Sequence, residues 1–467
     1  MSSTFFGFNI ARRGLSAHKA ALEVTAHNVA NASTPGYSRQ QAVFGTTSPF
    51  MTAGLNQPVQ AGQIGTGVTI SEVRRVRDSF LDYQIRPQQS KLGEWDERYA
   101  ALSHAEKILM EPTESGLSHV FSRFWEAWQE LSKNPTSGAA RAGVVEMGVT
   151  LATSLNAVAS QLEVSISDLD TKARLSVNDI NSIARQVAAL NRQIVANVGA
   201  GLSPNDLNDR RDTLLDDLAR ITGFAPLTQP NGAVDIVIGG KRLVQGIHFA
   251  ELSVAAGGQI VWPDGAALAP TEGRLAGVAE SRHWLQNEFY ERMNTLSEGL
   301  ADLVNTAHAA GQALTTPVPP ERGQGFFVFP PGSAGREARF IAVNPDIVAD
   351  HALLRAAATS GGLADGSNAL RVARQRHAAI PSGATNLEGF YGAIVTDLGV
   401  EAQQAARMFT NQDALVNQLQ NRRQEVAGVS IDEEMAFMIQ FQHGYAASAR
   451  LLATLDEMLA VLINLGR

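Results

Sequence analysis

The sequence contains no cysteine among its 467 residues. This absence excludes disulfide bonds, cysteine-ligated zinc, iron–sulfur clusters and thiol nucleophiles. Acidic residues outnumber basic residues by 46 to 38, which gives a net charge of −8. A chain with this balance lacks the overall positive field that favours binding to nucleic acid, so we expect no nucleic-acid partner. Aromatic residues are also few, at 6% of the chain.

The first residues lack the features of a cleaved secretion signal. Residues 1–8 contain no basic region, no long apolar core and no small-residue cleavage site. No apolar run approaches 18 residues, so we expect no membrane insertion. These absences predict either a cytoplasmic protein or one that is exported by a route that reads an uncleaved N-terminus.

Heptad patterns are present at both ends of the chain. Leu15, Leu22 and Val29 recur every seven residues in a helix predicted over residues 8–31, and Pro35 prevents its continuation. A second seam alternates spacings of three and four. Its apolar members are Met438, Phe441, Tyr445, Leu452, Leu455, Leu459 and Leu462. The matching seams predict that the terminal helices pack on each other and provide an assembly interface.

The C-terminal helix also has a start signal. Ser430, Asp432 and Glu433 read as a capping box, in which acidic residues favour the positive end of the helix. From this start the helix is predicted to run to Leu465.

The middle of the chain contains long helices and a β-rich segment. Heptad seams within residues 81–102, 151–194, 289–303 and 391–419 predict helices longer than the globular average. Between them, Asn231-Gly232 is a hairpin signal. Residues 32–70 read as an extended loop with one short strand at 67–70. The fold class is therefore mainly α with a β-rich insertion, an α+β multidomain chain.

We expect three discontinuous domains. The first is a terminal coiled-coil domain with an extended loop, the second a long helical bundle and the third a small outer β domain. Their predicted boundaries are residues 1–70 with 428–467, residues 71–222 with 271–320 and 385–427, and residues 223–270 with 321–384.

No pattern in the sequence indicates catalysis. Ser16 and Lys19 match a Ser-x-x-Lys motif, but its partner motifs are missing. His18 and His27 are nine residues apart, so they do not share a helix face as metal ligands would. We therefore expect no enzyme activity, cofactor or metal. Short basic clusters at residues 74–77 and 422–423 fit a solvated face or salt bridges between subunits better than nucleic-acid binding, because no aromatic surface accompanies them.

Two motifs near the ends of the chain resemble a known family. The N-terminal motif consists of Asn28, Asn31, Thr34, Pro35, Gly36, Tyr37, Ser38, Arg39 and Gln40. The C-terminal motif consists of Asp432, Glu433, Glu434, Met435, Gln442, Ala449 and Arg450. Together they resemble the flagellar axial proteins, which comprise rod, hook and hook-associated proteins, and the Thr34–Gln40 form is typical of the hook-associated branch. Weaker similarity is present at residues 208–218 and 340–348.

The resemblance implies a structural subunit of the bacterial flagellum. Its terminal helices would line the inner tube, and the subunit would form a ring between hook and filament that filament assembly requires. The implied partners are further copies of the chain, the hook protein, the second junction protein (hook-associated protein 3) and a flagellar export chaperone at the C-terminal helix. The implied location is extracellular, after uncleaved export through the flagellar type III apparatus.

Three alternatives remain open from the residues alone. The chain could be another axial protein, such as the hook or a distal rod protein. It could be an exported enzyme on a helical carrier, or a type III effector with similar terminal helices. The residues Thr34–Gln40 argue against an effector, and an enzyme would need a catalytic or metal motif in the β-rich segment.

Overall fold

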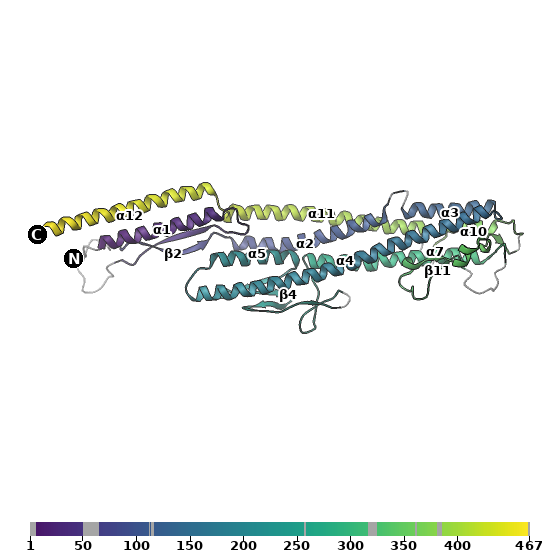
Figure 1. Ribbon diagram of the computed structural model, residues 1–467, viewed down its shortest axis with the longest axis horizontal. Helices are drawn as coiled ribbons and strands as arrows, with labels where there is room; N and C mark the ends of the chain where they lie inside the picture. The colour runs from purple at the N-terminus through teal and green to yellow at the C-terminus, as the bar shows by residue number, and fades with distance from the viewer. Residues whose placement is uncertain are drawn as a thin grey trace. The chain divides into compact units, whose positions relative to one another are not determined.

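The computed structural model describes residues 6–49, 65–111, 113, 116–255, 258–315, 325–359, 362–380 and 385–465 (Figure 1). Most of these residues are helical, and the strands form small antiparallel sheets, which confirms the predicted fold class. The chain divides into two compact units. The first contains Met1–Ser90, Asp179–Leu252 and Asp413–Arg467, and the second contains Lys91–Asn178 and Ser253–Gln412. The boundaries of the three predicted domains differ from this division and stay a prediction.

The two terminal helices pair in the first unit, as their seams predicted. Helix α1 (Phe6–Asn31) and helix α12 (Ile431–Leu465) are antiparallel, and the start of α1 lies beside the C-terminal part of α12 (Figure 1). Their register is constant along the pair. The facing residues are Gly7 with Leu455, Gly14 with Ser448, His18 with Gly444, and Asn28 with Glu434.

Small and polar residues form the α1 side of this seam. The buried residues of α1 are Ala11, Gly14, Ala17, Ala21, Thr25 and Asn28. Side chains of this size let two helix axes approach closely. Leu15, Leu22 and Val29 each follow a seam residue by one position and are half-buried. The predicted heptad residues therefore lie beside the contact with α12, each one position after a residue that α12 covers.

The loop expected after α1 contains a strand that the sequence analysis missed. Strand β1 (Gln40–Thr46) pairs with β2 (Val68–Arg75) in an antiparallel ladder, which is longer than the strand predicted at 67–70. A bulge interrupts the register between Val43 and Phe44. Isolated two-stranded ribbons are marginally stable in water, and this one packs against α1.

The rest of the first unit joins a short helix to a four-stranded sheet. Helix α5 (Asn205–Ile221) is followed by β3 (Ala225–Thr228), β4 (Val234–Ile238), β5 (Lys241–Gln245) and β6 (His248–Phe249), in that spatial order. The predicted hairpin at Asn231-Gly232 is confirmed, and Gly232 has a φ of +85°. The buried Asn191 side chain of α4 (Gly138–Gly199) donates hydrogen bonds to the carbonyl oxygens of Val234 and Gly246 and holds the sheet on the helix.

The second unit is mainly helical. Its helical segments are α2 (Ser79–Leu109) and α4, both shared with the first unit, α3 (Leu117–Lys133), α6 (Arg274–Trp284), a π-helical turn (Leu285–Tyr290), α7 (Glu291–Ala309), α8 (Glu337–Phe340), α9 (Pro345–Ala349), α10 (Ser367–Arg374) and α11 (Leu387–Ala427), also shared. Its short strands are β7 (Ser253–Val254), β8 (Ile260–Val261), β9 (Ala267–Leu268), β10 (Gly311–Gln312), β11 (Phe327–Val328), β12 (Ala342–Val343) and β13 (Ala357–Ala358). Edge-to-face contacts between Phe124, Trp128 and Phe326 form the centre of its core.

Helix α4 is one continuous helix that contains the predicted heptad region 151–194. By length and composition it is apolar enough to cross a membrane, the one such helix among the described residues. A core helix of a soluble protein passes the same test. Leu151, Leu155 and Leu162 are fully buried within the protein at helical spacing, which fits a core helix.

We predict that Gly444→Val weakens the α1–α12 pair. A Cβ at position 444 would lie 2.5 Å from the His18 ring, so the ring would have to move. Overpacking of this kind costs about 1–3 kcal/mol. Hydrogen exchange of the α1 amides should therefore be faster in this variant. Ala447→Val, at an exposed position of the same helix, is the control for helix propensity, and equal exchange in the two variants would contradict the packing argument.

Candidate assembly site

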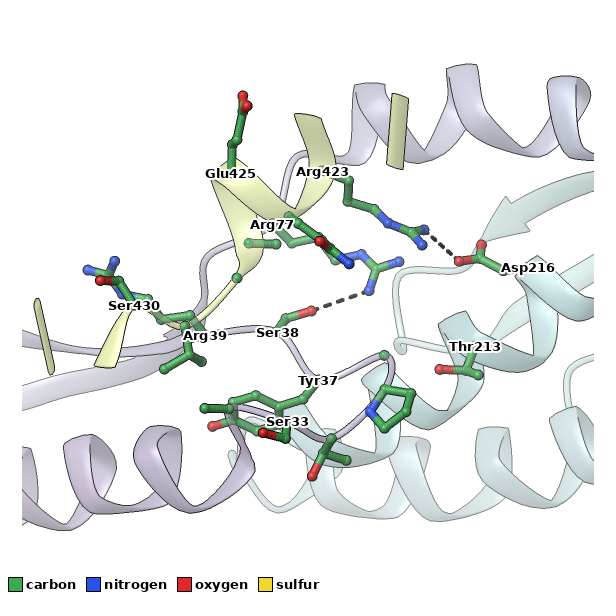
Figure 2. A pocket seen from close by; sticks show the side chains of 18 of the residues that line it. Ser33, Tyr37, Ser38, Arg39, Arg77, Thr213, Asp216, Arg423, Glu425 and Ser430 are labelled. Carbon is green, nitrogen blue, oxygen red and sulfur yellow. Dashed lines mark hydrogen bonds and ion pairs between the residues drawn. The ribbon is translucent and has the colours of Figure 1, made fainter. Parts of the chain in front are cut away.

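The N-terminal motif lies at a joint between four helices of the first unit. Residues 32–39 leave the end of α1, pass α5 and reach the end of α11 and the start of α12, around a cavity of about 710 Å³ (Figure 2). Most of the motif residues make hydrogen bonds or ion pairs there. The motif therefore holds the ends of these helices in a fixed arrangement.

Asn28 is the central hydrogen-bonding residue of this joint. It is 1% exposed, and its Nδ2 donates to the Gln40 carbonyl oxygen at 2.8 Å and to Glu434 Oε2 at 3.0 Å. Its Oδ1 accepts from the Gln40 amide at 2.9 Å and from the Tyr37 hydroxyl at 2.7 Å. One buried amide thus connects α1, the start of β1 and α12 with both donors and both acceptors satisfied.

Tyr37 packs between α1 and α5. Its ring contacts the His27 ring edge to face, and His27 Nε2 lies 3.7 Å from Asp206 Oδ2. Burial raises the pKa of Tyr37 well above its ordinary value, and Asp206 and other carboxylates add to the effect. The hydroxyl therefore stays a neutral donor to Asn28.

Gly36 allows the loop to approach α5. Its φ is +78°, in the left-handed region that favours glycine, and a Cβ there would overlap the Thr213 hydroxyl. Two residues later, the Ser38 amide donates to Asp209 Oδ2 at 3.0 Å. The Pro35-Gly36 turn and this hydrogen bond hold the loop on α5.

Arg39 joins the end of α11 to the start of α12. Its amide donates to the Ala427 carbonyl oxygen at 2.9 Å, one of the last carbonyls of α11. Its guanidinium lies 2.8 Å from Glu433 Oε2 and 3.2 Å from Glu434 Oε1. Ser430 Oγ accepts from the Glu433 amide at 3.4 Å, so the serine half of the predicted capping box is confirmed. The Glu433 carboxylate, however, binds Arg39.

A cluster of eight charged side chains lies beside this loop. Its members are Arg75, Arg77, Arg86 and Arg423 with Asp82, Asp209, Asp212 and Asp216. They come from β2 and the residues after it, α2, α5 and α11. The expectation that the two short basic clusters form a solvated face or inter-subunit salt bridges is therefore wrong for Arg75, Arg77 and Arg423, because these side chains make ion pairs within the chain.

Pairing compensates for the burial of these charges. Arg77 binds Asp82 with two hydrogen bonds, of 2.6 and 3.0 Å, and Arg75 Nη1 lies 2.8 Å from Asp212 Oδ2. Burial alone would raise the pKa of Asp212, but Arg77 and Arg75 outweigh it and lower that pKa below 3.8. Four arginines and four aspartates leave no net charge, the condition under which buried ions are tolerated.

The sequence analysis missed the acidic half of the cluster. Asp209, Asp212 and Asp216 follow spacings of three and four on α5, which places them on one helix face. This spacing was the available signal, and it lies in the segment 208–218 noted for weaker similarity.

The remaining predicted residues differ in exposure. Asn31 donates to the His27 carbonyl oxygen and accepts from the Thr34 hydroxyl within the turn. Asp432, Met435, Gln442, Tyr445 and Arg450 are exposed. Met438, Phe441, Ala449, Leu452, Leu455 and Leu459 are half-buried, and the side chain of Leu462 lies outside the described residues. Among the described residues, no group of three or more His, Asp or Glu side chains is arranged to hold a metal ion.

Comparison with known proteins identifies the family. The model of the helical domain of the flagellar hook-associated protein FlgK matches residues 102–327. A model of flagellar basal body rod proteins matches residues 8–37, and one of the C-terminal part of FlgEFG rod proteins matches 420–465. Flagellar hook-associated protein 1 of Bacillus subtilis (strain 168) is 35% identical over 501 residues, which cover 99% of each chain. The chain belongs to the flagellar hook-associated protein 1 family.

Further relatives support the same assignment. Flagellar hook-associated protein 1 of Escherichia coli (strain K12) is 25% identical over 554 residues, 98% of this chain and 99% of that protein. The flagellar hook junction protein FlgK from Burkholderia pseudomallei has a similar fold, with a TM-score of 0.63 and 16% identity over 74% of this chain and 100% of that chain. The resemblance drawn from the two motifs is confirmed, and the chain is a flagellar structural protein of the hook–filament junction.

We predict that the ion-pair cluster makes stability depend on acid. Because the folded pKa of Asp212 is below its ordinary value of 3.8, its stabilisation is present above that value and is lost as the pH falls toward the lowered pKa. Urea unfolding between pH 7 and pH 3 should show Asp212→Asn destabilised most at pH 7, with the difference from the natural chain shrinking below about pH 4. Asp456→Asn, at an exposed position of α12, serves as control, and a constant difference for Asp212→Asn across the range would contradict the pairing argument.

Proposed function

We propose that the chain forms a ring between hook and filament and that filament growth requires this ring. Its neighbours would be further copies of itself, the hook protein on one side and hook-associated protein 3 on the other. The chain would reach this position through the flagellar type III apparatus, without cleavage, after an export chaperone binds its C-terminal helix. Its role would be structural, without catalysis. Family membership supports assembly with other axial proteins.

The exposed apolar surface of α12 is the observation that carries this proposal. One face of α12 contacts α1, yet large hydrophobic side chains remain exposed elsewhere on the helix: Ile431, Met435, Ile439, Tyr445, Leu451, Met458, Val461 and Ile463. Monomeric proteins rarely leave extended apolar patches exposed, and such patches mark interaction sites. The burial of this surface between subunits would stabilise the ring by roughly 25 cal/mol per Å², before the costs of ordering.

These exposed side chains extend the predicted assembly interface. Leu15, Leu22 and Val29 remain proposed docking residues, because each is half-buried and keeps part of its surface at the edge of the α1–α12 seam. Ile431, Met435 and Ile439 are spaced four residues apart and form one stripe on α12. We propose this stripe as a leading contact surface between subunits.

Deletion of the gene tests the proposed role. We expect hooks without filaments and flagellin shed into the medium, as seen by electron microscopy and by analysis of the culture supernatant. Complementation with the natural gene should restore filaments, and immunogold label should then lie at the point where hook and filament meet. Normal filaments in the deletion strain, or label spread along the hook or rod, would contradict the junction role and favour another axial function.

We predict that the double variant Met435→Asp with Ile439→Asp folds but does not assemble. The two side chains are 48% and 53% exposed, so charges there should leave the monomer intact and oppose burial between subunits. Circular dichroism of the purified protein should be unchanged, while complementation of the deletion strain should fail. The matched control is Val400→Asp with Met408→Asp on α11, at 55% and 39% exposure, which should complement. Normal filaments with the α12 variant would overturn the docking role of the stripe.

A further inference from the structure

A second and larger cavity lies in the first unit. It has a volume of about 1140 Å³ and is lined by residues of β2, the start of α2, the end of α4, α5, β3 and the loops between them. Several apolar side chains on its wall are exposed, among them Val198, Leu202 and Leu227. Leu202 alone is 61% exposed. We call this cavity the α5 groove.

Arg211 on the wall of the α5 groove is 6% exposed, and no carboxylate among the described residues accepts a hydrogen bond from it. Its Nη atoms donate to neutral oxygens, the Gly232 carbonyl at 2.7 Å and the side-chain oxygens of Asn191 and Asn208 at 3.2 and 3.0 Å. Its Nε is buried without a hydrogen-bond acceptor among the described residues. Burial lowers the pKa of Arg211, and the nearby Asp212 carboxylate offsets this effect only in part.

The remaining charges of the α5 groove leave a small positive excess. Arg75, Arg77 and Arg86 are neutralised in the ion-pair cluster. Beyond that cluster, the wall carries Arg211 and Arg74 against a single acid, Glu72. The exposed Arg74 Nη2 donates to Gln41 Oε1 at 3.2 Å. The groove therefore suits an occupant that is apolar and acidic.

The C-terminal part of α12 has the complementary character. Asp456 and Glu457 are exposed there, next to Met458, Val461 and Ile463, which are also exposed. Met458 is 62% exposed. The segment from Leu451 to Leu465 contains these two acidic side chains and no basic one. This helix end therefore offers an exposed apolar surface together with two carboxylates.

The two surfaces of one copy lie at opposite ends of the α1–α12 pair. Leu455, beside the acidic end of α12, faces Gly7 at the start of α1. The α5 groove adjoins the other end, where Asn28 binds Glu434 and Ser38 binds Asp209. The 26 residues of α1 span about 39 Å between them. The helix end of the same copy therefore cannot occupy its own groove.

We propose that the α5 groove binds the acidic end of α12 from a second copy of the chain. The contact joins two different surfaces, so it is heterologous and generates a ring or helical array instead of a closed dimer. It rests on the proposed junction function and specifies which surfaces of neighbouring copies meet. The exposed Arg74 would face Asp456 and Glu457, and the buried charge of Arg211 would add to the positive field of the groove. Leu202 and Leu227 would cover Met458.

The absence of cysteine allows a direct test. In a strain that expresses Leu202→Cys and Met458→Cys as two differently tagged copies, each cysteine is unique in its chain. Thiol cross-linking of the isolated flagella should give a dimer that carries both tags. Val400→Cys in place of Met458→Cys is the matched control, since it is similarly exposed but lies on α11, and should give about tenfold less dimer.

Charge reversal tests the electrostatic part of the contact. Arg74→Glu in the Leu202→Cys copy should reduce the dimer about fivefold, the size expected for loss of one partly desolvated ion pair. Glu457→Arg in the Met458→Cys copy should then restore the yield. Failure of this restoration would overturn the assigned pairing of charges.

Failure of this inference is distinguishable from failure of the proposed function. If both cysteine variants support filaments but give no mixed dimer, the groove does not bind α12, while the junction role stands. A dimer between the groove cysteine and a different axial protein that carries an added cysteine would also overturn the second-copy assignment. Normal filaments after deletion of the gene would instead contradict the proposed function itself.

Discussion

The pairing of buried and partly buried charges at the joint is the constraint on which the first unit depends. An isolated buried guanidinium or carboxylate is costly, so each of the eight cluster members requires the others in place. Three of the aspartates belong to α5. Arg75 is the last residue of β2 and Arg77 follows it, while Arg423 lies four residues before the end of α11. Segments more than 300 residues apart are therefore brought together by the same electrostatic requirement, and Asn28 and Arg39 extend the network to α1 and α12.

One surface of each terminal helix forms the α1–α12 contact, and α12 keeps a second, apolar surface exposed. Glycine, alanine and serine at positions such as Gly14, Ala21 and Ser448 let α1 and α12 approach closely. Because small residues fill the seam, many of the larger apolar side chains of α12 stay outside it. A conventional leucine seam would bury them within the monomer. The seam of small residues leaves apolar surface on α12 that other subunits could cover. This arrangement agrees with membership of a family of flagellar axial proteins.

The Escherichia coli relative differs from this chain in length. The alignment with the Escherichia coli relative extends over 554 positions, more than the 467 residues of this chain, so that relative carries segments absent here. The rod-protein models nevertheless match both terminal helices, at residues 8–37 and 420–465.

Local signals in the sequence determined the terminal helices, the end of α1 at Asn31, the start of α12 after Ser430, and the Asn231-Gly232 hairpin. The reason is that helix capping, the restriction before proline and turn preference each act over a few residues. Only the tertiary structure decided which residues of α1 face α12, and these lie one position before Leu15, Leu22 and Val29. The spacing of large apolar residues predicts a helix face, but it does not reveal that two helices approach closely enough for small residues to form the contact. The tertiary structure also decided strand β1 and the partners of Asp209, Asp212 and Asp216. A strand forms only with a hydrogen-bonded partner strand, which can be distant in the sequence. A charged residue on a helix face is expected to contact solvent unless the fold places an arginine beside it.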